Sequence, residues 1–141
     1  MSFLLDTNVV SEWVKPHPEI KVVEWLAEAD EDRIFLSVIT LAEIRHGIEQ
    51  MTGGRRRSHL QSWLEEELPQ RFAGRLVEVN AEIANAWGRM MALSTKAGTP
   101  LSAMDAFFAA TANAMKCTLV TRNTKDFARL GIELLNPWIG I

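Results

Sequence analysis

The sequence predicts an α/β fold, a three-layer α/β/α sandwich around a central five-stranded, mainly parallel sheet. Short apolar runs without polar alternation, such as residues 3–5 and 34–36, are typical of strands buried on both faces. Longer segments with apolar residues at helical spacing separate these runs. Strands that alternate with helices in this way indicate parallel pairing, with helices on both faces of the sheet.

The first half of the chain is predicted to alternate strand and helix. Residues 3–5 form the first strand, and the acid and small polar residues that follow mark a turn and a helix start. Pro18 suits the first turn of a helix over residues 18–29. The predicted inward face of this helix comprises Ile20, Val23, Leu26 and Ala27. Residues 34–36 form the second strand, and residues 40–51 form a helix with apolar residues at helical spacing.

Glycine and proline set the bounds of the later helices. Gly53-Gly54 ends the preceding helix, and the next helix, which carries four large apolar side chains inward, is predicted to stop at Pro69. These side chains are Leu60, Trp63, Leu64 and Leu68. Residues 76–79 form the third strand. A helix over residues 81–97 follows, with Gly98-Thr99-Pro100 as its stop.

The last part of the chain completes the predicted sheet. Residues 103–115 are apolar nearly all the way round, which predicts a helix enclosed on most sides. Residues 117–121 and 132–135 form the fourth and fifth strands. No repeat or interdomain linker is visible, so the 141 residues are expected to form one domain, residues 1–141.

The composition narrows the functional classes. A net charge of −3 argues against binding nucleic acid through bulk charge alone, although a metal and a few local cations could still hold it. Cys117 has no second cysteine to pair with, so no internal disulfide is possible and a reducing, cytoplasmic location is expected. No apolar run approaches the ~20 residues that span a bilayer. No secretory signal is visible at the N-terminus.

Four acids follow predicted strands or open predicted helices: Asp6, Glu43, Asp105 and Asp126. Asp6 follows the first strand, and Glu43 and Asp105 lie in the first turns of their helices. Asp126 lies in the polar loop after the fourth strand. The carboxyl ends of parallel strands and the N-termini of the following helices share one edge of the sheet. These acids are therefore expected to meet, although they are far apart in sequence.

Helix capping is the competing interpretation of these acids. Asp6 could accept hydrogen bonds from the first free N–H groups of the next helix. The segments Thr40-Leu41-Ala42-Glu43 and Ser102-Ala103-Met104-Asp105 both fit a capping box, and for either acid taken alone capping is the stronger interpretation. Together the acids favour a shared site, because carboxylates in one partly buried pocket repel one another unless a cation is present. A hard divalent ion such as Mg²⁺ or Mn²⁺ suits such a site.

Four motifs, in this order, resemble those of PIN-domain ribonucleases. They are Leu5-Asp6-Thr7-Asn8, Ala42-Glu43-Ile44 with Gly47, Asp105-Ala106-Phe107-Phe108-Ala109-Ala110-Thr111-Ala112, and the loop over residues 121–127. Their order and spacing match along almost the whole chain. They are most similar to VapC toxins of bacterial toxin–antitoxin pairs, especially the FitB-like branch. The segment Leu135-Asn136-Pro137-Trp138 also resembles that branch.

The resemblance implies a metal-dependent endoribonuclease that hydrolyses RNA phosphodiester bonds with metal-activated water. It implies that Asp6, Glu43 and Asp105 form the acidic core and bind Mg²⁺ or Mn²⁺. Many family members carry Asp where this chain has Asn123, so Asp126 is the candidate for the fourth charge. The residues expected to hold water, phosphate or RNA around this core are Thr7, Asn8, Thr121, Arg122, Asn123 and Lys125.

The resemblance also implies partners: an RNA substrate, a cognate antitoxin protein and a second copy of the chain in a homodimer, with no membrane association. Trp13, Trp25 and Trp138 could belong to such interfaces. The triplet Arg55-Arg56-Arg57 could guide RNA or meet an acidic partner, and a solvated helix start is the simpler interpretation. The three histidines are not at metal-ligand spacing and are expected on the surface or in packing.

Other functions stay open at this level. A PIN nuclease could act in RNA processing outside toxin–antitoxin systems, or a non-catalytic PIN-like scaffold could have lost its activity, since Asn123 replaces an acid. A phospho-acceptor receiver fits poorly, because Thr7 and Asn8 follow Asp6 and the third predicted strand is followed by no Asp.

Overall fold

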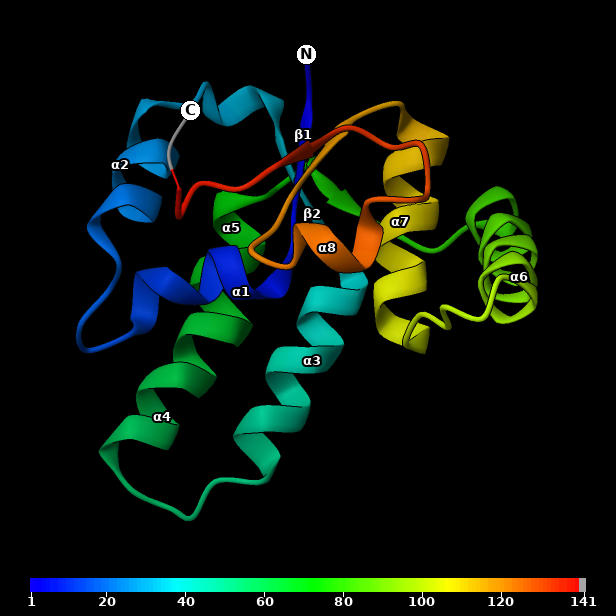
Figure 1. Cartoon of the computed structure of the whole chain (residues 1–141). Coiled ribbons are helices and arrows are strands. Elements are labelled where there is room, and N and C mark those ends of the chain that lie inside the picture. Colours follow the sequence, from blue (N-terminus) through cyan, green and yellow to red (C-terminus); the bar gives the residue numbers. More distant parts are fainter. Residues whose placement is uncertain (140–141) are drawn as a thin grey trace.

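The computed structural model describes residues 1–139, and its centre is a five-stranded sheet (Figure 1). The strands are β1 (Phe3–Leu5), β2 (Ile34–Ser37), β3 (Leu76–Val77), β4 (Thr118–Val120) and β5 (Leu134–Leu135). They lie in the order β3-β2-β1-β4-β5, and all four neighbouring pairs are parallel. The predicted parallel sheet is confirmed.

Helices and short helical turns connect the strands. They are α1 (Thr7–Val10), the 3₁₀ turn η1 (Ser11–Val14), α2 (Ile20–Glu28), the 3₁₀ turn η2 (Glu31–Arg33), α3 (Val38–Glu49), α4 (Arg55–Ser62), the π turn η3 (Trp63–Glu67), α5 (Leu68–Arg71), α6 (Ala81–Lys96), α7 (Ala103–Met115) and α8 (Thr124–Phe127). Helix α7 has the predicted bounds, and it is largely buried as expected. None of the helices within residues 1–139 combines the length and apolar character needed to span a bilayer.

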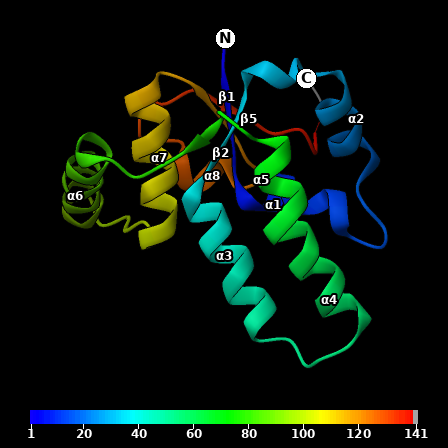
Figure 2. The same ribbon diagram turned by 180° about the vertical axis from the view of Figure 1, so that it is seen from behind.

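Two hydrophobic clusters pack against opposite faces of the sheet. Leu5 of β1 belongs to the larger cluster, together with buried side chains of α1, α2, α3 and α5. Leu4 belongs to the second cluster, with Phe108 of α7 and Phe127 of α8. Because successive residues of a strand point to opposite faces, β1 supplies both clusters. Figures 1 and 2 show helices on both sides of the sheet and α6 outside α7, so the three-layer prediction is confirmed.

The edge strands are shorter than predicted. Residues 76–79 were expected to pair, but β3 comprises only Leu76 and Val77. These residues lie opposite Leu36 and Ser37, the last residues of β2. The chain then turns into α3, so the residues after Val77 have no strand to pair with. β5 is short in the same way, because its one neighbour is the three-residue strand β4.

Two helix starts differ from the prediction. Helix α2 begins at Ile20 rather than Pro18, because the Glu19 backbone N–H donates to the Glu12 carboxylate (2.8 Å) and Glu19 stays extended as the N-cap. Ile20 and Ala27 are exposed, so the predicted inward face was partly wrong. Helix α3 begins directly after β2 with Ser37 as its N-cap. The predicted capping box of Thr40 and Glu43 is therefore wrong, and Glu43 lies in the second turn.

The predicted stop at Pro69 is also wrong. Helix α4 continues through the π turn into α5 and reaches Arg71. A proline in an α-helix lacks an N–H donor, and its ring clashes with the carbonyl four residues earlier. In the π turn the Leu68 N–H bonds to the Trp63 carbonyl, five residues back, which widens the helix just before the proline. Pro69 then falls in the first turn of α5, where it is tolerated.

Candidate functional site

The candidate site lies at the topological switch point of the sheet, between β1 and β4. β1 leads to β2 and β3 on one side, whereas β4 and β5 lie on the other. In open α/β sheets, ligands bind outside the carboxyl ends of the strands at such a switch point. Asp6 follows β1 and Thr121 follows β4. Figure 1 shows α1, α3 and α8 beginning at this same edge of the sheet.

Asp6 is both a helix cap and the centre of the site. Its Oδ1 accepts a hydrogen bond from the Thr7 backbone N–H (2.7 Å), as the capping interpretation predicted. Its Oδ2 accepts a hydrogen bond from the Thr121 hydroxyl (2.7 Å), which comes from the neighbouring strand. The side chain is only 5% exposed. Capping uses one carboxylate oxygen, so it does not exclude a further role.

Burial raises the pKa of Asp6 from 3.8 to about 6. The hydrogen bonds from Thr121 and Thr7 favour the ionised form and oppose this shift. The negative charges of Asp105 and Glu43 add to it. The charges of Glu43 and Asp105 thus act on Asp6, whereas the charge of Asp126 acts on Asp105.

Glu43 is tied to the start of α1 by a hydroxyl. The Thr7 hydroxyl donates to Glu43 Oε1 (2.5 Å) and also lies 3.1 Å from the Thr40 hydroxyl oxygen. Thr40 is fully buried in α3, one turn before Glu43. Thr7 therefore holds Glu43 against the Asp6 turn. The part played by Thr40 was missed, because its capping-box pattern pointed to a helix start.

Asp105 and Asp126 form the other side of the site. Burial raises the pKa of Asp105, and the charge of Asp126 raises it further. The Asp105 backbone N–H donates to the Ser102 hydroxyl oxygen (3.1 Å), so the predicted cap of α7 is confirmed. Asn123 precedes α8, and its backbone N–H donates to the Thr121 hydroxyl oxygen (3.0 Å). Asp126 itself lies in the short helix α8 (Thr124–Phe127), so its predicted place in a loop was wrong. Thr121 links Asp6 to Asn123, the residue that precedes this helix.

The arrangement fits a hydrated hard ion better than a closed cage. Within residues 1–139, no three His, Cys, Asp or Glu side chains lie close enough together to hold one ion. Mg²⁺ commonly keeps several waters and binds through one or two carboxylates. The buried carboxylate of Asp6 and its acidic neighbours can supply those ligands. Asn8 Oδ1 is in addition a buried oxygen without a hydrogen-bond partner in the described part of the chain.

Glu12 is a buried acid that the sequence did not single out. Burial tends to raise its pKa, but hydrogen bonds from the Glu19 N–H and the Lys15 ammonium, and the charges of Lys15 and Arg122, hold it below the usual range. The Arg122 guanidinium in turn lies 5.4 Å from the centre of the Trp138 ring. Glu12 lies among apolar residues, and no local sequence pattern indicates that Lys15, Glu19 and Arg122 surround it.

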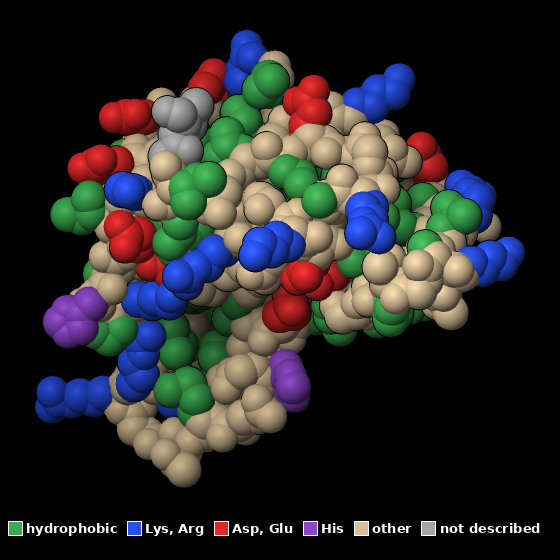
Figure 3. Space-filling model, in the orientation of Figure 1, with side chains coloured by type: hydrophobic (Ala, Val, Ile, Leu, Met, Phe, Trp, Pro, Cys, Tyr) green, Lys and Arg blue, Asp and Glu red, His purple; other side chains and the backbone are tan. Residues whose placement is uncertain are grey.

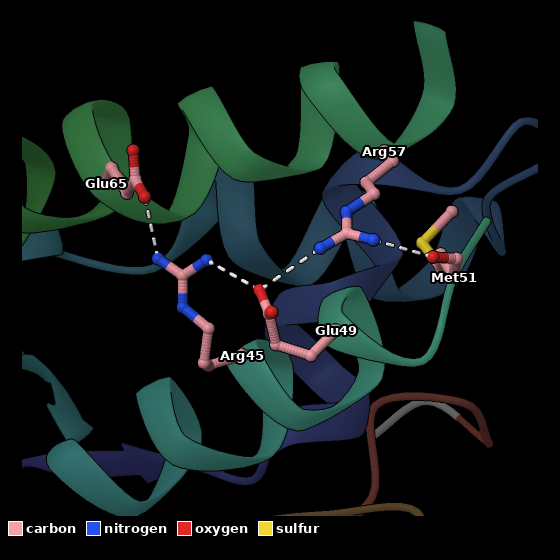
Figure 4. Close-up of polar contacts among 5 residues, drawn as sticks. All are labelled: Arg45, Glu49, Met51, Arg57 and Glu65. Carbon is pink, nitrogen blue, oxygen red and sulfur yellow. Dashed lines mark hydrogen bonds and ion pairs between the residues drawn. The ribbon is translucent and has the colours of Figure 1, made fainter. Parts of the chain in front are cut away.

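Most of the arginine triplet is engaged within the fold. Arg57 donates to the Met51 carbonyl (2.8 Å) and pairs with Glu49 (3.4 Å), as Figure 4 shows. Arg45 bridges Glu49 and Glu65 (3.4 and 2.8 Å) and so links α3 to the α4–η3 segment. Outside this cluster, Arg56 donates to the Val14 carbonyl (2.6 Å). These exposed pairs orient the two helices and contribute little stability.

The tryptophans proposed for interfaces also pack within the chain. Trp25 contacts Phe3 edge to face, with ring centroids 5.3 Å apart, and Arg71 lies 4.0 Å from the Trp13 ring centre. His17, His46 and His59 are exposed, as predicted. Figure 3 shows acidic side chains gathered where α8 approaches α3, with Lys and Arg side chains along the adjoining edge.

A match to a family model covers most of the chain. Residues 3–133 match the model of the PIN domain. The chain belongs to the PIN domain family. The predicted family, and the fold that it implies, are confirmed.

Relatives with established names cover nearly the full length of this PIN protein. It is 38% identical to the plasmid stability protein StbB of Pseudomonas syringae pv. tomato, 34% to the toxin FitB of Neisseria gonorrhoeae and 35% to the VapC ribonuclease Y4jK of Sinorhizobium fredii. Each match covers 96% of this chain and 96–97% of the relative. A chain in the structure of FitAB bound to an IR36 DNA fragment has a TM-score of 0.89 and 33% identity, over 96% of this chain and 95% of that chain.

Proposed function

We propose that this PIN protein is a metal-dependent endoribonuclease and the toxin of a toxin–antitoxin pair. The observation that carries the proposal is the buried carboxylate of Asp6 at the switch point of the sheet, with Glu43 and Asp105 near enough to raise its pKa. Such a group is costly to ionise without a cation beside it. Relatives named as a VapC ribonuclease and as the toxin FitB support both the chemistry and the biological role.

In this proposal Asp6 and Asp105 hold a Mg²⁺ or Mn²⁺ ion. Glu43 would orient the attacking water, because no three acids of residues 1–139 lie close enough together to hold one ion. The ion would neutralise charge on the scissile phosphate and lower the pKa of water. The hydroxyl groups of Thr121 and Thr7 hold the Asp6 and Glu43 carboxylates in place by hydrogen bonds. Asp126 adds negative charge beside Asp105, and the neutral Asn123 leaves that side with one acid fewer than many relatives of the family carry.

RNA cleavage by two Asp→Asn variants tests the proposed catalytic role of the acids. Asp6→Asn and Asp105→Asn are expected to fold normally and to lose RNA cleavage in Mg²⁺ or Mn²⁺ by about 100-fold or more, because each replaces a charged ligand by a neutral amide. Glu24→Gln, an exposed acid on α2 away from the site, is the matched control and should retain full activity. Far-ultraviolet circular dichroism checks the fold of each variant. Full metal-dependent cleavage by either Asn variant would refute the assignment.

The metal and the partners need measurements that do not depend on cleavage. Titration calorimetry with Mn²⁺ should show binding to the unmodified protein and much weaker binding to Asp6→Asn.

Expression in bacteria should arrest growth, and the product of an adjacent small antitoxin gene should relieve the arrest. The likeness to a chain of the FitAB assembly supports such a partner. Sedimentation velocity tests the proposed homodimer. An active nuclease that does not arrest growth would instead fit RNA processing.

A further inference from the structure

A large cavity opens beside the acids, and apart from two of these acids its lining takes no part in the chemistry proposed above. It has a volume of about 1050 Å³ and lies between α6, the start of α7 and the segment from α8 to Leu130. Asp105 and Asp126 line it, so it is continuous with the acidic site. Small-molecule sites usually measure ~300–1,000 Å³, so this cavity can admit a nucleoside with its phosphate.

Three cations line this cavity: Arg89 of α6, Lys125 of α8 and Arg129 just after it. None of the three forms an ion pair with an acid of residues 1–139, whereas Arg45, Arg57 and Arg71 do. All three are exposed at the cavity surface. They are therefore available to an anionic ligand. A protein with a net charge of −3 needs such local cations to attract a polyanion.

The same cavity has an apolar wall on α6. Leu93 is 66% exposed although it is a large hydrophobic residue, and it lines the cavity beside the half-buried Met90. Leu130 contributes from the opposite side. An exposed leucine next to unpaired cations matches a ligand that is apolar on one part and anionic on another. A nucleotide has this character, with the faces of its base and its phosphate.

We propose that this cavity binds one nucleotide of single-stranded RNA beside the phosphodiester that is cleaved, with its phosphate among Arg89, Lys125 and Arg129 and its base against Leu93. The inference rests on the proposed ribonuclease function, because continuity with Asp105 is what places the nucleotide next to the reacting bond. A single strand is required, since only an unpaired base can leave its stack and enter a cavity.

Binding without cleavage tests the cationic part. The probe is a fluorescein-labelled 12-nucleotide single-stranded RNA of mixed sequence, and its anisotropy is followed in EDTA over a range of salt. Arg89→Gln and Arg129→Gln should each weaken binding about fivefold at 0.1 M salt and reduce the salt slope by about 0.7, the value for one phosphate contact on a single strand. Lys21→Gln is the control, because Lys21 is exposed on α2, unpaired within residues 1–139 and outside the cavity.

Comparing the 12-mer with an abasic strand tests the proposed contact between the base and Leu93. Leu93→Asn should weaken binding of the 12-mer and leave unchanged the binding of an abasic strand with the same ribose-phosphate backbone. The arginine variants should weaken binding of both strands. If all these variants bind the 12-mer as the unmodified protein does, the proposal is wrong.

Sedimentation velocity on each variant separates RNA binding from self-association. If affinity falls only in step with conversion of a dimer to a monomer, the cavity is an interface between two copies and the nucleotide proposal is overturned. Failure of the ribonuclease proposal is distinguishable, because it would appear as absent cleavage in metal while the binding results in EDTA stand. If the cavity variants bind RNA normally while Asp105→Asn loses cleavage, the nucleotide proposal fails and the ribonuclease proposal stands.

Discussion

At the scale of single residues, two hydroxyl groups decide how the acids are held. The Thr121 hydroxyl donates to Asp6 and the Thr7 hydroxyl donates to Glu43, so carboxylates from distant segments are fixed by short side chains on the adjacent turns. The positions of Asp6 and Asp105 could be predicted, because each follows a clear strand or opens a clear helix. The buried contacts of Thr40 and Glu12 could not, since they depend on which segments pack together.

The raised pKa of Asp6 predicts a pH-dependent stability. Folding raises this pKa from 3.8 to about 6, so the folded state holds the proton more tightly than the unfolded state. The stabilisation is therefore fully present below pH 3.8 and is lost as the pH rises through about 6. Without metal at pH 8, ionised Asp6 costs about 3 kcal/mol. Asp6→Asn avoids this cost but loses part of a hydrogen bond worth about 1 kcal/mol.

Asp6→Asn should accordingly be more stable than the unmodified protein by about 1–2 kcal/mol at pH 8 in EDTA, and this advantage should shrink as the pH falls through about 6. Urea denaturation at pH 8, 6 and 5 measures the difference. Glu24→Gln provides a control that should show no such trend. An advantage independent of pH would mean that Asp6 titrates normally.

At the scale of elements, the sequence predicted which segments are helices better than where they begin and end. Helix α7 was found with its bounds because Ser102 caps it and its apolar character is continuous. Helix α3 begins earlier than predicted because Ser37, the last residue of β2, is itself the cap. The helix through Pro69 persists because of a π turn, which no local pattern indicates. In each miss, the chain on either side decides the boundary.

The end of α7 offers a stability prediction at this scale. Lys116 is in the left-handed conformation, with φ 54° and ψ 45°, and follows the last helical residue. A non-glycine residue in this conformation costs ~1–2 kcal/mol. Glycine avoids that strain, but it loses more conformational entropy on folding, which offsets part of the gain. Lys116→Gly should therefore raise the free energy of unfolding by about 0.5–1 kcal/mol, measured by urea denaturation. Ala92→Gly, inside the exposed face of α6, should lower it by about 1 kcal/mol. Destabilisation by both would contradict the helix-cap explanation.

At the scale of the whole molecule, the order of the strands is what assembles the site. Residues 6, 43 and 105 are distant in sequence, and the charges of Glu43 and Asp105 nevertheless act on Asp6, which follows β1 between the neighbouring strands β2 and β4. Parallel pairing was predictable from the buried strands, and this pairing placed the acids at one edge. The cavity behind α6 was not predictable, because the sequence shows α6 only as an amphipathic helix and not as the outermost layer against α7.

A site built from such distant segments should couple metal binding to the stability of the entire fold. An ion that binds only the folded state stabilises it by about 2.7 kcal/mol when its free concentration is 100 times its Kd. For a chain of this size, that corresponds to roughly 10 °C in Tm. Asp6→Asn should show little of this shift, and Glu24→Gln should show all of it. The order of stability at pH 8 should therefore reverse: the Asn variant has the higher Tm in EDTA, and the unmodified protein has the higher Tm in saturating Mn²⁺. Scanning calorimetry in both conditions measures the reversal, and equal Mn²⁺ shifts in the two proteins would remove Asp6 from the metal site.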